Sequence, residues 1–302
     1  MIIVQNRKIF FAISGALVAT ALLSVAVFGL KFGTDFTGGT LVQATYAGGR
    51  PAPDALSVAL DEAGLAGYSL REANENDYIL RAANLTTEQR EQIEETLSIG
   101  GESPVVIAQL TEVGPTIGKE LRNKAFIAVV LVMTAILFFI AFAFRKVSKP
   151  ISSWIYGLIA LVTLGFDVLI PVGFYALLGF LTGAQVDTLF ITAVLTVLGY
   201  SVHDTIVVFD RVRENLRINQ EKGRREDFAE TAGRALGQTF VRSTTTSLTT
   251  ALALTTLYIF GPTSTSHFAL TLLIGIIVGT YSSIFLATPL LVAVERRFAK
   301  RK

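Results

Sequence analysis

The chain has 302 residues, of which 51% are hydrophobic, and a mean hydropathy of +0.55. It is more apolar than a water-soluble domain of this length, which excludes that class and predicts a polytopic α-helical membrane protein. The absence of cysteine excludes disulfides and thiolate metal sites, and the net charge of +2 says little about partners because the basic residues follow the membrane topology.

The first apolar run covers residues 9–30 and follows Arg7 and Lys8. It is long for the core of a signal peptide, which is the alternative, and no small-residue cleavage pattern follows it. We therefore expect an uncleaved transmembrane helix whose N-terminus lies in the cytoplasm.

Residues 31–123 are polar and resemble a water-soluble domain. Their alternation, helical spacing and capping residues predict strands at 40–46, 68–71, 77–81 and 104–110 and helices at 54–62 and 86–97. The order β-α-β-β-α-β is the ferredoxin-like pattern. A faint phosphate-loop likeness at 114–120 has the wrong glycine spacing and no hydroxyl after Lys119, so we predict no nucleotide hydrolysis and no enzyme.

Five more apolar runs predict membrane helices, for six in all: 125–144, 154–180, 188–209, 237–260 and 267–294. Loops 181–187 and 261–266 contain no Lys or Arg, whereas the other loops and the tail are basic, which predicts cytoplasmic termini and an extracytoplasmic polar domain. The predicted domains are 1–30 (N-terminus and first helix), 31–123 (ferredoxin-like domain), 124–294 (helices two to six) and 295–302 (basic tail). Acidic residues interleave the arginines after Asp210, which favours a solvated connector over a nucleic-acid surface.

Asp204 lies within the predicted fourth span, where a carboxylate costs about 2.5–3.5 kcal/mol and marks a candidate functional residue. It shares a helical face with Tyr200 and Ser201, and nearby Gly199 predicts close approach by another helix. We expect Asp204 to bind and release an ion, with a static interhelical hydrogen bond as the alternative. The adjoining His203 points about 100° away and either titrates or packs at a helix contact.

Arg242 opens the fifth span and is the expected counter-charge of Asp204. Its spacing places Thr245, Thr246 and Thr249 on the same helical face. An interfacial arginine that extends to the membrane surface is the alternative. Asp167 is a second intramembrane acid in the third span, expected at mid-depth or further outward; a carboxylate relay and a structural link between helices both stay open.

These motifs together resemble the SecF branch of the SecD/SecF family of bacterial protein-export membrane proteins. The resemblance covers essentially the whole chain and rests on ordered motifs: Gly33-Thr34-Asp35-Phe36-Thr37-Gly38-Gly39-Thr40, Val113-Gly114-Pro115, Asp167-Val168-Leu169-Ile170, Gly199-Tyr200-Ser201-Val202 with Asp204-Thr205, and Arg242-Ser243 with Thr246-Ser247-Leu248-Thr249-Thr250. Two positions depart from the family pattern, because His203 is commonly Asn and Phe166 is commonly His.

The resemblance implies half of a twelve-helix unit of the resistance–nodulation–division superfamily, completed by SecD in the bacterial inner (plasma) membrane. It implies use of the proton motive force, with Na⁺ as the open alternative and no cofactor or metal. That force would help an unfolded polypeptide finish crossing the SecYEG channel, with SecA acting upstream. The resemblance also implies YajC and membrane lipid as further partners, and no nucleic acid as a partner. Asp204 would be the ion-binding carboxylate, Arg242 its switchable partner and Thr246 a supporting hydroxyl.

For Asp35, Gly38 and Gly39 we expect a turn that leads into the first strand, with glycines supplying unusual backbone angles, rather than a substrate contact. Two other functions stay open. A small-molecule or lipid exporter of the same superfamily predicts a larger external region, and a non-conducting scaffold predicts that Asp204 and Arg242 only hold helices together.

Overall fold

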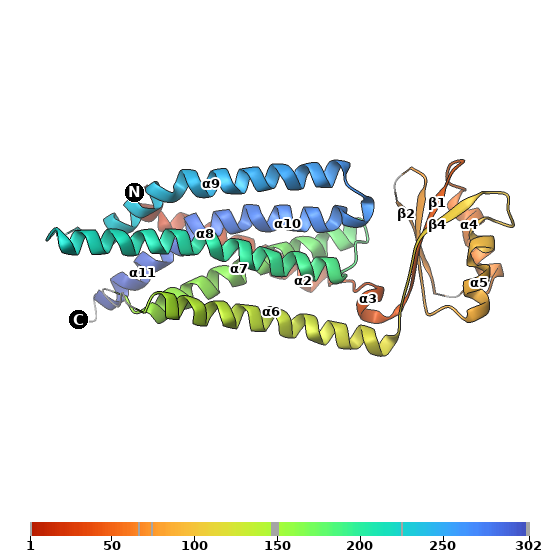
Figure 1. The fold of residues 1–302 in the computed structure, drawn as a ribbon, viewed down its shortest axis with the longest axis horizontal. Coiled ribbons are helices and arrows are strands. Elements are labelled where there is room, and N and C mark those ends of the chain that lie inside the picture. Colours follow the sequence, from red (N-terminus) through yellow and green to blue (C-terminus); the bar gives the residue numbers. More distant parts are fainter. Residues whose placement is uncertain (1, 66, 74, 146–150, 225, 300–302) are drawn as a thin grey trace. The chain divides into compact units, whose positions relative to one another are not determined.

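The chain divides into two compact units (Figure 1), as seen in a computed structural model that describes residues 2–65, 67–73, 75–145, 151–224 and 226–299. One unit, here the helical unit, comprises Met1–Lys31, Ile127–Ala184 and Leu189–Lys302. The other, here the sheet unit, comprises Phe32–Phe126 and Gln185–Thr188. Helices α6 and α8 each have residues in both.

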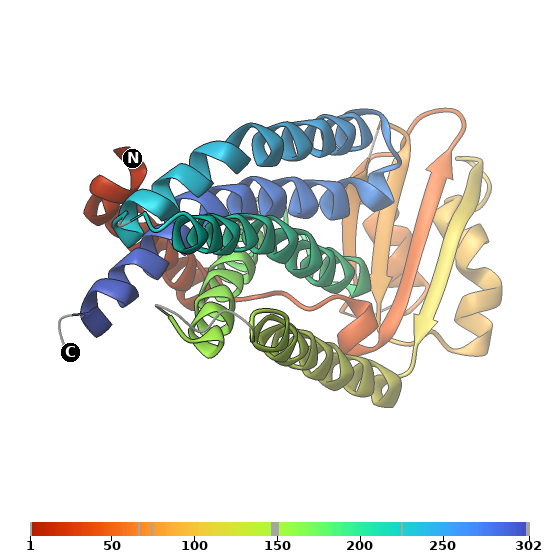
Figure 2. The same ribbon diagram turned by 60° about the vertical axis from the view of Figure 1, so that its left-hand side comes forward.

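The helical unit is built from long helices. Figures 1 and 2 show α8, α9 and α10 side by side in both views. The elements are α1 (Ile2–Gln5), α2 (Arg7–Phe28), most of α6 (Pro115–Ala143), α7 (Ser153–Leu181), α8 (Thr188–Glu221), α9 (Phe228–Phe260), α10 (Thr263–Ser282), the π-helix η1 (Ser283–Ala287) and α11 (Thr288–Ala299).

Within the described residues, five helical stretches are long and apolar enough to cross a bilayer, which confirms a multi-pass membrane-type protein. They are Arg7–Phe28, Pro115–Ala143, Ser153–Leu181, Thr188–Glu221 and Thr265–Phe298. Helix α9, the predicted fifth span, is a helix of 33 residues but is not among these five. Its hydroxyl-rich segment 243–250 lowers its hydropathy, so the sixth span stays a prediction.

The helices on either side of the arginine-rich segment are longer than expected. Helix α8 continues to Glu221 and α9 already begins at Phe228, so most of the expected connector after Asp210 is helical. Apolar runs indicate only the depth of the membrane, whereas ion pairs one turn apart extend the helix into water. Three such pairs lie on α8: Arg213–Asp210, Arg211–Glu214 and Arg217–Glu221.

The sheet unit holds a four-stranded sheet of order β2-β3-β1-β4, in which all neighbours are antiparallel. After the short helix α3 (Thr34–Thr37) the elements are β1 (Gly39–Tyr46), α4 (Pro53–Glu62), β2 (Ser69–Ala73), β3 (Asp77–Ala82), α5 (Thr87–Leu97) and β4 (Val105–Val113). Figure 2 shows α4 and α5 on one face of the sheet. Within the segment 114–120, compared above with a phosphate loop, residues 115–120 form the start of α6.

The side chains of β1 alternate between the two faces of the sheet, and those on one face form the core of this unit. Val42, Ala44 and Tyr46 are buried in one cluster with Leu56 of α4 and Leu97 of α5. The Tyr46 hydroxyl donates to the Leu97 carbonyl at 2.9 Å, which satisfies a polar group inside the apolar core. A capping box formed by Thr86 and Gln89 begins α5 where the capping residues predict it.

Candidate functional site

A layer of buried polar side chains crosses the helical unit. We call it the polar layer; it consists of Asp167 on α7, Ser201, Asp204 and Thr205 on α8, Ser243 and Ser247 on α9, and Ser282 and Ser283 where α10 meets η1. Along α8 it lies between an apolar cluster at Ala193 and Val197 and another at Val208. These apolar clusters separate the polar groups from both ends of the helix, so charges inside the layer interact strongly.

Asp204 is the final acceptor of a short hydrogen-bonded chain through three helices. Its side chain is buried, and Ser247 of α9 donates to its Oδ2 at 3.5 Å. The Thr280 hydroxyl of α10 donates in turn to Ser247 Oγ at 2.6 Å. A change in the charge of the carboxylate would therefore be felt directly by α9 and, through Ser247, by α10.

Asp167 is fully buried and accepts a hydrogen bond from Ser201 at Oδ2. Its Oδ1 has no hydrogen-bond partner in the described part of the chain. Pro171 follows inside α7 and has no amide hydrogen for the helical bond to the Asp167 carbonyl. Because Ser201 lies three residues before Asp204, the two acids are only about 4.5 Å apart along the α8 axis. The two acids thus differ in depth by less than one helical turn, and the relay stays a prediction.

Two glycines bring α10 close to α8 at the polar layer. A Cβ on Gly275 would lie 2.2 Å from Val197 Cγ2, and one on Gly279 would lie 2.9 Å from the Ser201 Oγ. Gly199 does not make this contact: within the described part of the chain, a Cβ there would meet no atom of a neighbouring segment within 4 Å. The Gly-x-x-x-Gly spacing of 275 and 279 is a known signal of helix contact in membranes and could have identified the true contact.

A π-helical turn follows this contact. Element η1 begins at Ser283, directly after the buried Ser282, and the Thr288 hydroxyl donates to the Ser283 carbonyl at 3.4 Å. Single π-helical turns inside α-helices occur frequently at functional sites because they rearrange the backbone hydrogen bonds. The apolar run 267–294 carries no sign of this interruption.

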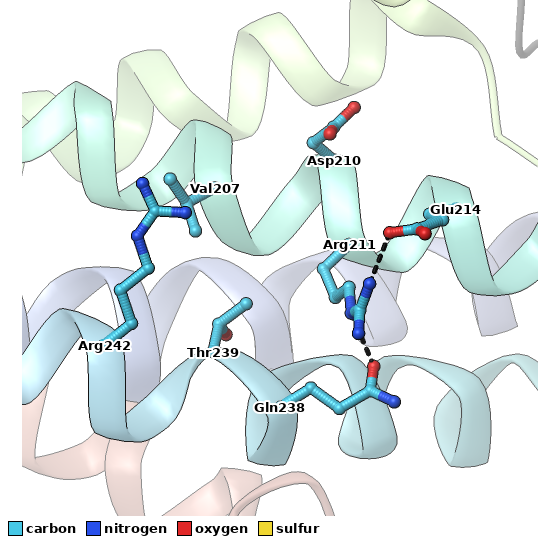
Figure 3. A pocket seen from close by; sticks show the side chains of 7 residues that line it. All are labelled: Val207, Asp210, Arg211, Glu214, Gln238, Thr239 and Arg242. Atoms are coloured by element: carbon cyan, nitrogen blue, oxygen red, sulfur yellow. Dashed lines mark hydrogen bonds and ion pairs between the residues drawn. The ribbon is translucent and has the colours of Figure 1, made fainter.

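Arg242 is exposed on α9, and the ion pairs of the described residues do not include one with Asp204. It acts on that carboxylate only through longer-range electrostatic attraction. In Figure 3 its guanidinium lies beside Val207, which follows Asp204 by less than one turn of α8. The predicted pair is therefore near but not formed.

The same side chain lines a cavity of about 250 Å³ between α8 and α9. Arg211 crosses this cavity, since it donates to Glu214 at 2.5 Å and to Gln238 at 2.8 Å (Figure 3). The other lining residues are Val207, Asp210 and Thr239. The cavity is thus lined mainly by polar and charged side chains, and Val207 on its wall follows Asp204 by less than one turn of α8.

The threonine hydroxyls predicted beside Arg242 lie on the exposed face of α9. Thr245, Thr246 and Thr249 are all exposed, whereas Ser243 and Ser247, which the spacing from Arg242 did not indicate, face the polar layer. The buried face of α9 is offset by one residue from the face that spacing from Arg242 suggested.

Two supporting residues on α8 lie beside the polar layer. His203 is exposed, one residue before Asp204. Tyr200 is half-buried, with its hydroxyl 3.4 Å from that of Thr250 on α9.

The predicted turn residues lie in the sheet unit. Asp35 forms part of α3, and Gly38 and Gly39 have φ values of +80° and +126°, a region that favours glycine. The described residues contain no group of three or more His, Cys, Asp or Glu side chains that could hold a metal ion.

Residues 94–297 match the family model described as "Protein export membrane protein SecD/SecF, C-terminal", and residues 23–47 match that of the SecD/SecF GG motif. The protein translocase subunit SecF of Thermobaculum terrenum is 39% identical, across 98% of this chain and 94% of that protein. The SecF of Anaerolinea thermophila is 36% identical, across 97% of this chain and 94% of that protein.

Two solved structures are also similar. The crystal structure of SecDF from Thermus thermophilus, described as a translocon-associated membrane protein, matches with a TM-score of 0.83 at 31% identity. A SecDF structure in a super-membrane-facing form matches with a TM-score of 0.68, also at 31% identity. The chain is covered to 97% and 98% in these matches but spans only 38% and 39% of the SecDF chains.

Proposed function

The chain belongs to the SecD/SecF family of protein-export membrane proteins, and we propose that it uses a transmembrane ion gradient to help polypeptides complete their passage through the SecYEG channel. Its SecF relatives and the SecDF match support a role in protein translocation with SecD as partner. In the proposed complex SecA drives the earlier, ATP-dependent steps and YajC is an accessory partner. The chain itself carries out no enzymatic reaction and needs no cofactor.

The observation that carries this proposal is the buried Asp204 in the polar layer. An acid at this depth in a membrane protein is costly and marks an ion pathway or a relay. The hydrogen bond that Ser247 donates to Asp204 is long, at 3.5 Å, and the ion pairs of the described residues do not include Asp204. Such weak anchoring supports a carboxylate that exchanges an ion, because a purely structural acid would be expected to have a close partner.

The proposed cycle starts when an ion reaches Asp204 from the outside and neutralises it. Neutralisation weakens the attraction between Asp204 and Arg242 and alters the bond from Ser247, so α9 and α10 repack against α8. Moving one charge through 100 mV supplies about 2.3 kcal/mol, which shifts a two-state population about fifty-fold. Thr246 supports the path, Asp167 is a second carboxylate less than one turn away, and H⁺ is the proposed ion, with Na⁺ as the alternative.

SecD is proposed to cover the exposed face of α9. A guanidinium and several hydroxyls facing lipid would be unfavourable, and this face carries Arg242, Thr245, Thr246 and Thr249. The SecDF chains are more than twice as long as this one, which supports a second half that completes the path. In that arrangement α9 also crosses the membrane, as the fifth of six spans, because its polar face meets protein and not lipid.

Charge supports the remaining membrane topology, and sheet order supports the proposed fold of the sheet unit. Basic loops and a basic tail support cytoplasmic termini in the bacterial inner membrane, which places the sheet unit outside. The sheet order β2-β3-β1-β4 with two helices on one face supports a ferredoxin-like domain. In the proposed complex this domain contacts the emerging polypeptide.

The test uses inverted vesicles that contain this chain, SecD and the translocation channel. Completion of a stalled secretory protein is followed after ATP is exhausted, with and without an imposed gradient. We expect gradient-dependent completion in the wild type and in Glu221→Gln, an exposed change near the end of the same helix, and its loss in Asp204→Asn. Completion that is unchanged in Asp204→Asn would contradict the proposal.

The scaffold alternative is distinguished by a double variant. If Asp204 and Arg242 only hold helices together, neutralising both with Asp204→Asn and Arg242→Gln should restore the activity that either change alone removes. We expect the double variant to stay inactive, because an ion carrier cannot be replaced by an amide.

A further inference from the structure

The glycine-rich motif between α2 and β1 has a geometry that the proposed function leaves unused. We propose that Asp35 is a positioning residue that couples α8, the helix that carries Asp204, to the sheet unit. This inference rests on the proposed function, since it assigns the route by which movement at the ion site reaches the sheet unit. Its structural part can be tested without any translocation assay.

Asp35 binds the first residue of α8 with two hydrogen bonds. Its Oδ2 accepts from the Thr188 backbone amide at 2.9 Å and from the Thr188 hydroxyl at 2.7 Å. Hydrogen bonds to a carboxylate are about twice as strong as neutral ones, and a negative charge at a helix N-terminus interacts favourably with the helix dipole. Asp204 lies on the same helix, about 24 Å further along.

The backbone next to Asp35 forms a second link to the segment that leads into α8. The Gly33 amide donates to the Val186 carbonyl at 2.8 Å, and Phe32 and Val186 form a parallel bridge. A side chain at position 33 would lie 3.2 Å from that carbonyl, so the two segments are in close backbone contact. Residues 32–35 therefore hold residues 186–188 through both backbone and side chain.

The rest of the motif is packed without free space against the other elements of the sheet unit. A Cβ on Gly38 would lie 2.7 Å from the Cα of Pro115, the first residue of α6. A Cβ on Gly39 would lie 2.5 Å from the Ala82 carbonyl at the end of β3, and one on Gly118 would lie 2.9 Å from the Gly38 amide nitrogen. Backbone atoms cannot move aside as side chains do, so a displacement of α8 at Thr188 is passed on to β1, β3 and α6.

A capping role alone does not account for Asp35. Helix α8 has 34 residues and follows Asp187, a residue type that is favoured directly before a helix. The carboxylate of Asp35 comes instead from a segment 153 residues earlier in the chain. Its two bonds hold together two distant segments, which a local cap does not do.

The structural test is hydrogen exchange of the full complex with SecD. Asp204→Asn imitates the neutralised carboxyl and is expected to change exchange in residues 32–46; in the Asp35→Ala background this change should disappear. Asp35→Ala alone should raise exchange at the Thr188 amide roughly tenfold, because a charged hydrogen bond shifts a local opening equilibrium by about that factor. Asp54→Ala, an exposed acid in the first turn of α4, is the matched control.

Two milder variants guard against simple misfolding. Asp35→Asn keeps the size and one acceptor but loses the charge, and Thr188→Val removes only the hydroxyl. Both are expected to give a partial loss of the response in residues 32–46. A response of full size in Asp35→Ala, or an equal loss in Asp54→Ala, would overturn the coupling role.

The functional test compares ion uptake with translocation in the same vesicles. We expect Asp35→Ala to retain gradient-driven ion uptake and to lose gradient-dependent completion, whereas Asp204→Asn loses both. Loss of both in Asp35→Ala, or loss of neither, overturns the inference and leaves the proposed function standing. If even the wild type shows no gradient dependence while the exchange response still requires Asp35, the proposed function fails and the mechanical coupling stands.

Discussion

Replacing Gly275 with alanine is expected to force α10 away from α8 at the polar layer. The new methyl would lie 2.2 Å from Val197 Cγ2 and 2.9 Å from Cγ1. The first of these distances is roughly 1.3 Å shorter than ordinary carbon–carbon contact at about 3.5 Å. A β-branched valine in a helix has one strongly preferred rotamer, so Val197 cannot turn aside and the two helices must separate.

The expected net loss of stability is about 2 kcal/mol. Inserting a methyl into a packed contact costs about 1–3 kcal/mol, and a clash this short belongs at the upper end. Alanine recovers about 1 kcal/mol through its higher helix propensity. The shift of α10 would also change the position of Thr280 relative to Ser247, so gradient-driven translocation should fall together with stability.

The assay is unfolding of the purified complex with SecD, and the control is Gly199→Ala. Position 199 has open space where the methyl would lie, so this variant should be as stable as the wild type or slightly more stable. Adding Val197→Ala to Gly275→Ala should restore much of the lost stability, because it removes the atoms that clash. Equal stability of the two single glycine variants would refute the assigned contact.

Three further predictions follow from single side chains. Ser247→Ala removes the hydroxyl 3.5 Å from Asp204 and should lower gradient-dependent completion in vesicles several-fold. A hydrogen bond from Arg234 lowers the pKa of Glu226 below its usual 4.5. The ionised Glu226 therefore stabilises the fold above pH 4.5, and this contribution is lost as the pH falls further. The Tm of the wild type should drop more on acidification than that of Glu226→Gln. Burial raises the pKa of Tyr46 to about 12. The protonated Tyr46 therefore stabilises the fold below pH 10, and this contribution is lost as the pH rises towards 12. Tyr46→Phe should cost about 1 kcal/mol of stability at neutral pH and should lose less stability than the wild type between pH 10 and 12.

Each of these has a matched control. Thr256→Val on the same helix as Ser247 removes a hydroxyl that bonds only the preceding turn, so it should leave completion unchanged. For the two pH predictions the control is the wild-type protein, measured over the same pH range. A Glu226→Gln protein as acid-sensitive as the wild type would contradict the role of Arg234.

Local physical chemistry in the sequence accounts for much of the fold. Apolar runs long enough for a bilayer identify α2, α6, α7, α8 and the stretch through α10 and α11. The alternation of apolar and polar residues identifies β1, and the capping-type residues Thr86, Thr87 and Glu88 identify the start of α5. The intramembrane acids Asp167 and Asp204 also stand out by sequence alone, because the cost of placing them in lipid depends only on residue type and depth.

The arrangement of the site depended on how the helices are rotated and paired. Spacing places Arg242, Thr245 and Thr246 on one face of α9, but α9 is rich in hydroxyls around its circumference and has no apolar stripe to show which face is buried. Only the packing against α8 and α10 turned Ser247 towards Asp204. The contact between Asp35 and Thr188 likewise joins segments far apart in the chain, and no local pattern carries information about such a pair.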